Sequence, residues 1–323
     1  MTSMLGDKKS GQGAFTFSLR SDLYSLPKEA NEHEVKLHGG FAIDNRQGHG
    51  QLYYGMPELG ILRISPDLKE QHVMPLPEDL VPLNYHSTKI GHFDGEEKLI
   101  LPSNDGGKVV IMSLEGKVEA TLARPEFDEY GEKDLTYSPT DTITIDGEIY
   151  IADGYGANFI STHHVQTQQW KTIFGGPAKD ANDDGKFSTA HGMGINPVHN
   201  HIDICDRPNA RIQAHAPDGG FLSSYKLPEG SFLCGINYHE VEGRWYAVIG
   251  CLRDPKVKEG RPAPIYIIDA ETYELLSVIR PKEELGVDLA QHIHNVVLHE
   301  VDGTLYLVCQ AWNPGHYFVL QQV

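Results

Sequence analysis

The sequence predicts an all-β fold, a six-bladed β-propeller that forms a single domain. Two observations support this prediction. One short pattern, a turn that contains glycine or asparagine followed by an alternating apolar run, occurs six times in the 323 residues. The chain also contains 33 glycines and 19 prolines, as expected of a protein with many turns, and it has few long amphipathic patterns.

The repeated pattern accounts for the strands of each blade in order. Its copies lie at residues 48–54, 94–100, 146–151, 199–204, 242–247 and 302–307. Each turn is a hairpin signal between two strands of period two. A third strand follows, and often a fourth, as at residues 109–112 and 265–268. Repeats of this kind are typical of propeller blades, in which closure of the ring protects the sheet edges.

The two ends of the chain complete this arrangement. Residues 1–30 are polar and are expected to form an N-terminal extension that extends the last blade or lies over one face of the ring. Residues 31–323 then form the propeller, in which each sheet packs its faces against its neighbours. The charged stretch at residues 256–261 is expected to be a solvated loop.

Composition restricts the partners and the compartment. The chain has 27 Lys and Arg against 45 Asp and Glu, a net charge of −18, which argues against nucleic acid or an anionic membrane. No apolar run approaches the roughly 18 residues that cross a bilayer, and the N-terminus lacks a secretory signal. The four cysteines have no CxxC spacing and are expected to be buried free thiols. We therefore expect a cytoplasmic protein with a small-molecule substrate.

Aligning the repeats by their hairpins identifies the residues that should face the central channel. Stepping back from each hairpin to the start of its inner strand gives Gly39, His86, Thr140, His191, Cys234 and His294. Three of these six positions are histidine, although the chain has only 17 histidines. A single histidine in a strand is usually a core residue. Three that fall in one ring by register indicate a metal site, because three imidazoles can hold zinc and leave its fourth position open.

Other polar residues lie close to these positions. His38 and His292 precede channel positions by one and two residues, and they are interpreted as substrate contacts, as partners of the ligands or as exposed strand-end residues. Tyr155 and Arg207 follow aspartates at blade ends, where they would act as a base and as a partner for an oxyanion or carboxylate. The alternative is a structural role, because Asp turns commonly bond backbone N–H groups.

Four segments resemble peptidylglycine α-hydroxyglycine amidating lyase, a six-bladed propeller of the NHL type. They are Ser138-Pro139-Thr140-Asp141, the run from Ile149 to Tyr155, Ala190-His191-Gly192, and the run from Cys205 to Gln213. The resemblance is close over residues 135–215 and is carried by register elsewhere.

This resemblance implies a zinc ion in the channel and a specific reaction. It implies that His86, His191 and His294 bind the zinc, that Tyr155 is the catalytic base and that Arg207 lies beside it. The reaction would split an N-(α-hydroxy)glycine into an amide and glyoxylate, with the metal stabilising the alkoxide.

The sequence departs from the family pattern at several positions. The second active-site arginine of the family falls near Met56 in this sequence. His292 stands where the family has a methionine, two residues before the last zinc histidine. Asn295 replaces an aspartate that helps to hold a structural calcium, and Gly156 replaces a disulfide cysteine. The metal ligands are therefore retained while the substrate contacts change. Met56, Thr140 and Cys234 join His38 and His292 as candidates to contact the substrate or the ligands.

These observations leave three main interpretations. The first is a zinc-dependent lyase that acts on a carbinolamide-like or α-hydroxy small molecule. The second is an oxygenase with iron or copper on four histidines, in which His38 or His292 supplies the fourth imidazole, since imidazole suits zinc, iron and copper alike. The third is a non-catalytic scaffold that holds protein partners. A calcium-dependent lactone hydrolase on a similar propeller is a minor fourth.

Overall fold

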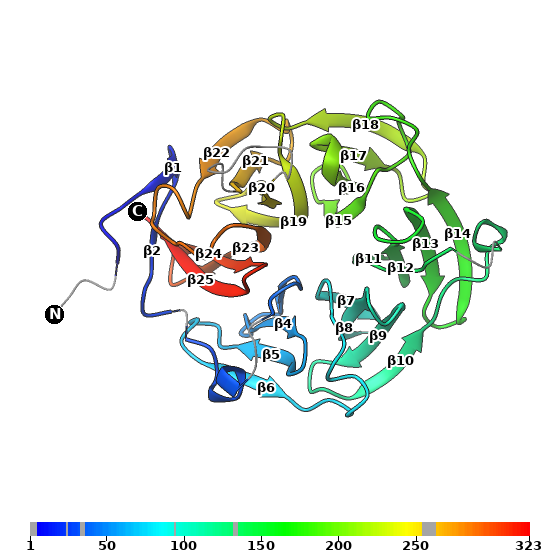
Figure 1. Ribbon diagram of the computed structural model, residues 1–323, viewed down its shortest axis with the longest axis horizontal. Coiled ribbons are helices and arrows are strands. Elements are labelled where there is room, and N and C mark those ends of the chain that lie inside the picture. The colour runs from blue at the N-terminus through cyan, green and yellow to red at the C-terminus, as the bar shows by residue number, and fades with distance from the viewer. Residues whose placement is uncertain (1–4, 24, 33–35, 94, 132–134, 254–262) are drawn as a thin grey trace.

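Six β-sheets stand around a central channel, as the sequence predicts (Figure 1). The computed structural model describes residues 5–23, 25–32, 36–93, 95–131, 135–253 and 263–323. Over these ranges the only helices are three short 3-10 turns, and the rest is strands and loops. None of these helices is long and apolar enough to span a membrane. The charged stretch at residues 256–261 lies outside the described residues.

Each of the first five blades is a four-stranded antiparallel sheet. The first blade consists of β3 (Ala42–Ile43), β4 (Leu52–Met56), β5 (Gly60–Ile64) and β6 (Gln71–Met74), and the second of β7 (Lys89–Phe93), β8 (Glu96–Ser103), β9 (Lys108–Ser113) and β10 (Val118–Leu122). The third consists of β11 (Asp141–Ile145), β12 (Glu148–Ala152), β13 (Phe159–His164) and β14 (Gln169–Gly175), and the fourth of β15 (Ala190–Asn196), β16 (His201–Asp206), β17 (Arg211–His215) and β18 (Phe221–Lys226). The fifth consists of β19 (Phe232–Val241), β20 (Arg244–Leu252), β21 (Ile265–Asp269) and β22 (Leu275–Ile279).

The sixth blade joins the two ends of the chain in one sheet. Its strands are β23 (Ile293–Val301), β24 (Thr304–Ala311) and β25 (His316–Gln322), followed outward by β2 (Phe15–Leu19) and β1 (Ser10–Gln12). Phe17 pairs with Gln322 and Leu19 with Leu320, so the N-terminal segment lies antiparallel to the last strand. This pairing closes the ring between the last blade and the start of the chain.

The repeated turns are the hairpins that the sequence indicates. At Asp146-Gly147 and at Asp302-Gly303 both turn residues have positive φ, between 48° and 81°. Two-residue hairpins of this kind match the twist of the flanking strands, and glycine tolerates the conformation without steric cost. The turns therefore fix the register of the inner strands, which determines the side chains that face the channel.

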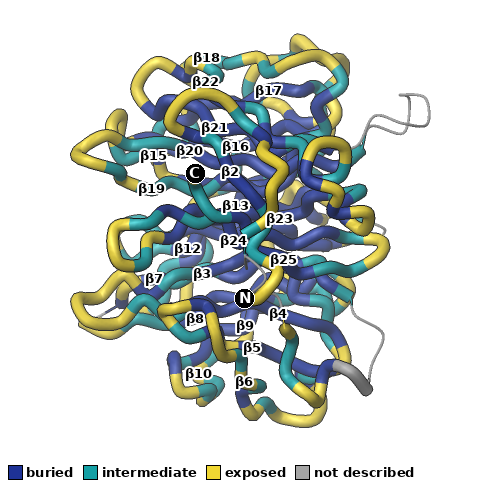
Figure 2. Tube along the Cα trace, turned by 90° about the vertical axis from the view of Figure 1, so that its left-hand side faces the viewer, coloured by how far each residue is buried: buried dark blue, intermediate teal, exposed yellow. Residues whose placement is uncertain are grey.

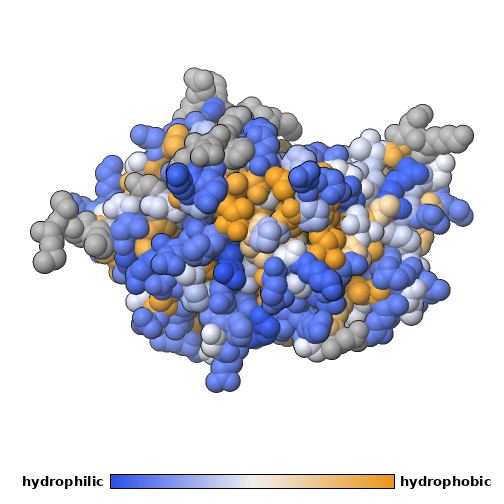
Figure 3. Space-filling view, turned by 90° about the horizontal axis from the view of Figure 1, so that it is seen from below, coloured by the Kyte–Doolittle hydropathy of each residue, from blue (hydrophilic) through white to orange (hydrophobic). Residues whose placement is uncertain are grey.

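The core lies between blades, where neighbouring sheets pack face to face. Ile143 and Ile160 of the third blade, for example, share a buried cluster with Met193 and Ile204 of the fourth. The strands contain most of the buried residues, and the exposed residues concentrate in the loops that connect them (Figure 2). The outside of the ring is mostly hydrophilic on the side that carries β6 and β10, with an apolar area near its middle (Figure 3). All four cysteines are buried and unpaired, as expected.

We expect replacement of Phe17 by alanine to lower the free energy of unfolding by about 3–5 kcal/mol. The Phe17 side chain is fully buried in the cluster that joins the fifth and sixth blades, so its loss leaves a cavity at the ring closure. Phe221→Ala is the matched control, because Phe221 is 37% exposed. Denaturant unfolding of both variants measures the difference. Equal effects would show that the N-terminal strands do not stabilise the ring.

Candidate metal centre

The three histidines of the predicted ring lie together at the centre of the propeller. His86 lies in the segment before β7, while His191 and His294 are the second residues of β15 and β23. The ring centroids of His86 lie 4.6 Å from those of both other histidines, which are themselves 5.0 Å apart. All three side chains are buried, with at most 2% of each residue exposed. Residues from the second, fourth and sixth blades thus meet as the repeat register predicts.

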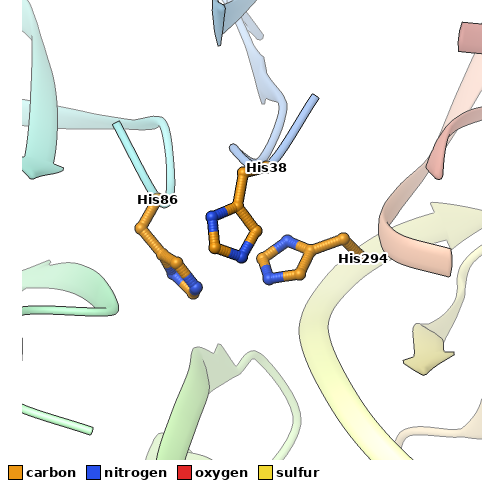
Figure 4. A group of neighbouring side chains, drawn as sticks. All are labelled: His38, His86 and His294. Carbon is orange, nitrogen blue, oxygen red and sulfur yellow. The ribbon is translucent and has the colours of Figure 1, made fainter. Parts of the chain in front are cut away.

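A fourth imidazole, that of His38, joins this cluster from the first blade. Its ring centroid lies 4.4 Å from those of His86 and His294. One ring nitrogen from each of these three residues lies within 4.8 Å of the others (Figure 4). The repeat register had placed Gly39 at this position. A Cβ at Gly39 would approach the Tyr85 carbonyl oxygen to 2.8 Å, so there is no room for a side chain at this position, and the preceding residue, His38, supplies the imidazole.

Hydrogen bonds determine which ring nitrogen of two histidines carries the proton. His86 Nδ1 donates to the carbonyl oxygen of Thr140 at 2.7 Å, which leaves an unprotonated Nε2 without a partner. The Thr140 hydroxyl donates to the Ala190 carbonyl at 2.8 Å and so ties the third blade to the fourth. In contrast, the Asn84 amide donates to His38 Nδ1 at 2.8 Å. Neutral His38 therefore carries its proton on Nε2.

Several imidazole nitrogens of the cluster are buried without a hydrogen-bond partner. They are His86 Nε2, His191 Nδ1 and both ring nitrogens of His294. Burial lowers the pKa of all three histidines well below its usual value, so these rings are neutral and each has one lone pair. Unpartnered buried polar atoms are costly, and a metal ion is a partner that neutral imidazoles accept. Over the described residues, His86 and His294 share a donor group with His38, and His191 shares one with Cys234 and His294. Imidazole nitrogens suit zinc, iron and copper alike.

Tyr155 and Arg207 lie directly beside this cluster. Arg207 Nη1 donates to the Tyr155 hydroxyl oxygen at 2.9 Å, and Nη2 contacts His191 Nε2. The Tyr155 oxygen also lies 3.1 Å from His191 Nε2. Burial raises the pKa of Tyr155, and the guanidinium of Arg207 acts in the opposite direction. Because Tyr155 is 36% exposed and Arg207 only 5%, the tyrosine is the member of the pair that a substrate can reach.

Aspartate-centred turns hold these two side chains. The Asp153 carboxylate accepts the N–H groups of Ser138 at 2.6 Å and Ala157 at 2.8 Å, which fixes the turn that contains Tyr155. The Asp206 carboxylate accepts the N–H of Ser188 at 2.9 Å and precedes the 3-10 turn that contains Arg207. Asp153 and Asp206 therefore have the structural role expected of aspartates in turns, and these same turns position Tyr155 and Arg207 beside the histidine cluster.

Arg207 is a buried cation without a carboxylate partner in the described part of the chain. Its other contacts are the Leu233 carbonyl at 3.3 Å, Cys234 Sγ at 3.4 Å and the rings of Tyr155 and Phe232, at 5.4 and 5.6 Å from the guanidinium carbon. A buried guanidinium is costly unless an anionic group accepts its N–H groups. Arg207 is thus poised to stabilise negative charge on Tyr155 or on a bound molecule.

Two further candidates lie away from the cluster. Met56 ends β4, and its fully buried side chain packs in an apolar cluster with Tyr54 and Leu62. It therefore offers no surface to a substrate, which corrects the sequence-based expectation. His292 accepts the N–H of Arg253 at 3.1 Å and packs on the edge of Trp312, which in turn stacks on His38. Neither residue belongs to a donor group of the described residues.

The structural calcium implied by the family resemblance does not fit the described residues. Asn295 accepts a hydrogen bond from Asn237 Nδ2 at 3.1 Å, and no carboxylate stands at its position. The nearby carboxylate of Asp141 already contacts the Lys89 ammonium group at 3.5 Å and accepts the Met193 N–H at 2.7 Å. Calcium requires six to eight oxygen ligands, whereas a lysine cation occupies this part of the channel. The alignment of the repeats did not identify Lys89 as a residue of the channel.

Comparison with known proteins supports the fold. No family profile matches the chain, and no curated protein matches it in sequence. Among solved structures, a gluconolactonase from Xanthomonas campestris superposes with a TM-score of 0.60 and 12% identity, covering 99% of this chain and 98% of that one. A streptogramin B lyase gives 0.57 and 12%, covering 96% and 99%. A catalytically inactive virginiamycin B lyase from Staphylococcus aureus, crystallised with quinupristin, gives 0.55 and 11%, covering 90% and 96%. The chain is thus similar in fold to six-bladed propeller proteins.

Proposed function

We propose that the protein is a metal-dependent lyase that acts on a carbinolamide or another α-hydroxy small molecule in the propeller channel. The observation that supports this proposal best is the meeting of three buried imidazoles, those of His86, His191 and His294, at centroid distances of 4.6 to 5.0 Å. The hydrogen-bonded pair of Tyr155 and Arg207 lies next to them. Similar folds occur in proteins described as lyases, at 11% and 12% identity. A bound zinc ion would lower the pKa of a substrate hydroxyl and stabilise developing negative charge.

The residues of the site can carry out the remaining steps. Tyr155 would take the proton of the substrate hydroxyl as a phenolate, in which Arg207 and a bound metal ion together offset the burial that raises the pKa of this tyrosine. The electron pair of that O–H bond becomes the second bond of a carbonyl group as the carbon–nitrogen bond breaks. Its electrons go to the departing nitrogen, which receives the proton back from Tyr155. An N-acyl-α-hydroxyglycine would thus give an amide and glyoxylate, with all atoms conserved.

Glyoxylate release tests this proposal. The zinc-loaded protein is mixed with an N-acyl-α-hydroxyglycine and, separately, with other α-hydroxy compounds, and the aldehyde product is measured. We expect turnover with at least one member of this class and none after chelation. Absence of turnover with all of them, in protein that carries stoichiometric metal, would contradict the lyase proposal.

A four-histidine oxygenase is the second candidate, and the environment of His38 supports it. Asn84 Oδ1 is buried without a partner. With this amide turned over, Oδ1 would accept a hydrogen bond from a protonated His38 Nδ1 and leave the lone pair on His38 Nε2, which gives four imidazole donors. Iron or copper on such a set would consume oxygen during turnover.

The metal content of His38→Ala separates the two candidates. Under the lyase proposal His38 is not a ligand, so the variant keeps about one zinc per chain. His191→Ala, in contrast, loses it. Loss of iron or copper from both variants, with oxygen uptake by the wild type, would favour the oxygenase and contradict the lyase.

A further inference from the structure

Cys234 is a thiol in the propeller channel to which the proposed reaction assigns no role. It lies in β19 and is fully buried. Its Sγ, a ring nitrogen of His191 and a ring nitrogen of His294 all lie within 4.8 Å of one another. These donors come from the fifth, fourth and sixth blades, so only the closed ring brings them together. The other three cysteines are buried too, but over the described ranges none of them belongs to such a donor group.

The two histidines of this set have lone pairs that a metal could use. Both ring nitrogens of His294 are buried without a hydrogen-bond partner, and the lone pair of His191 lies on Nε2, because that nitrogen faces Arg207 Nη2. A neutral imidazole has one lone pair and one N–H group, and burial without partners costs free energy. His294 also belongs to the nitrogen-only set with His38 and His86. His294 therefore belongs to both donor sets, of which only the set with His191 and Cys234 contains sulfur.

Arg207 indicates that the sulfur and the His191 nitrogen face the same point. Its Nη2 donates to Cys234 Sγ at 3.4 Å and contacts His191 Nε2 as well. One cationic N–H group thus lies against two lone pairs that a metal cation would also use. Arg207 Nη1 donates to Tyr155, so a metal ion that displaced Nη2 would leave the bond to the tyrosine in place.

We propose that Cys234 is a metal ligand and that His191, Cys234 and His294 form a nitrogen–sulfur site selective for thiophilic ions, zinc or cuprous copper. This inference rests on the metal binding proposed above and places Cys234 instead of His86 beside His191 and His294, so three protein ligands still leave the fourth position open. A thiolate favours zinc and Cu(I) over hard ions such as magnesium and calcium. The thiol proton leaves to solvent as the sulfur binds, so metal uptake releases a proton.

Cobalt(II) is the probe for this site, because a thiolate bound to it gives a charge-transfer band in the near ultraviolet. Cobalt chloride is titrated anaerobically into the metal-stripped full chain. We expect visible d–d bands together with the charge-transfer band. Cys234→Ala should abolish the charge-transfer band, retain the d–d bands and lower zinc affinity by more than about 100-fold, since loss of outer-shell partners alone costs 10–100-fold. The matched control, Cys251→Ala, removes an equally buried thiol of β20 and should keep every band.

The possible outcomes separate this inference from the proposed function. Visible d–d bands without a charge-transfer band in the wild type would show that the histidines bind metal and the sulfur does not, which overturns the role of Cys234 alone. No cobalt binding at all would contradict both proposals. A charge-transfer band that persists in Cys234→Ala would assign the sulfur to another cysteine and overturn the inference.

A measurement on the wild type keeps the inference testable if Cys234→Ala does not fold. X-ray absorption of the zinc-loaded chain distinguishes sulfur at about 2.3 Å from nitrogen at about 2.0–2.1 Å. We expect one sulfur and at least two imidazole scatterers. A shell of nitrogen and oxygen alone would overturn the inference.

Discussion

Replacement of Tyr155 by phenylalanine is expected to lower kcat by about 10²- to 10⁴-fold, the usual contribution of a positioned general base. The change removes the oxygen that accepts from Arg207 Nη1 at 2.9 Å and keeps the ring. The metal content should not change, because the variant keeps every histidine of the cluster.

The assay for this prediction measures kcat and bound metal in the same samples. Tyr225→Phe is the control, since Tyr225 stacks on Tyr273 in an outer part of the molecule and should leave kcat unchanged. Undiminished turnover in Tyr155→Phe would remove the proposed base. Loss of metal in that variant would instead assign Tyr155 a role in metal binding.

Asp206→Asn is expected to lower the free energy of unfolding by about 3–5 kcal/mol, because it breaks a buried ion pair. The Asp206 carboxylate accepts Arg211 Nε at 2.9 Å, and both residues are at most 2% exposed. Without that carboxylate the buried positive charge of Arg211 loses its buried counter-ion. The turn that holds Arg207 also loosens, so kcat should fall together with stability.

Asp184→Asn provides the comparison for this effect. Asp184 contacts the same arginine, Arg211, at 3.1 Å, but its side chain is 53% exposed. Exposed ion pairs contribute about 0–1 kcal/mol, so this variant should unfold close to the wild type. Equal losses in the two variants, measured by denaturant unfolding, would show that burial does not determine the strength of the pair.

The architecture could be predicted from the sequence because the repeats contain both the turn residues and the alternating apolar residues that determine strand pairing. Turns such as Asp146-Gly147 set the hairpin register, and the register places His86, His191 and His294 in one ring. Side chains of a strand alternate between its two faces, so the position of the turn determines which residues face the channel. The positions of three distant histidines could therefore be inferred from local patterns alone.

The parts that could not be predicted depend on contacts between blades. Gly39 lies against the carbonyl of Tyr85 and has no room for a side chain, whereas His38 beside it joins the cluster, and an alignment of turns does not show this difference. Lys89 of the second blade lies 3.5 Å from the Asp141 carboxylate of the neighbouring third blade. Met56, which the resemblance placed near a functional arginine, packs into the core. The periodicity of a single segment gives no information about such contacts between residues that are distant in the sequence.

Elemental analysis of the tag-free protein tests the central claim, that the buried histidine cluster holds a metal, most directly. Wild type is compared with His294→Ala, which removes the imidazole common to both donor groups, and with His292→Ala, which lies outside them. The account predicts about one metal ion per chain in the wild type and in His292→Ala, and none in His294→Ala. A wild type without metal after zinc, iron and copper loading, or an ion that remains in His294→Ala, would contradict it.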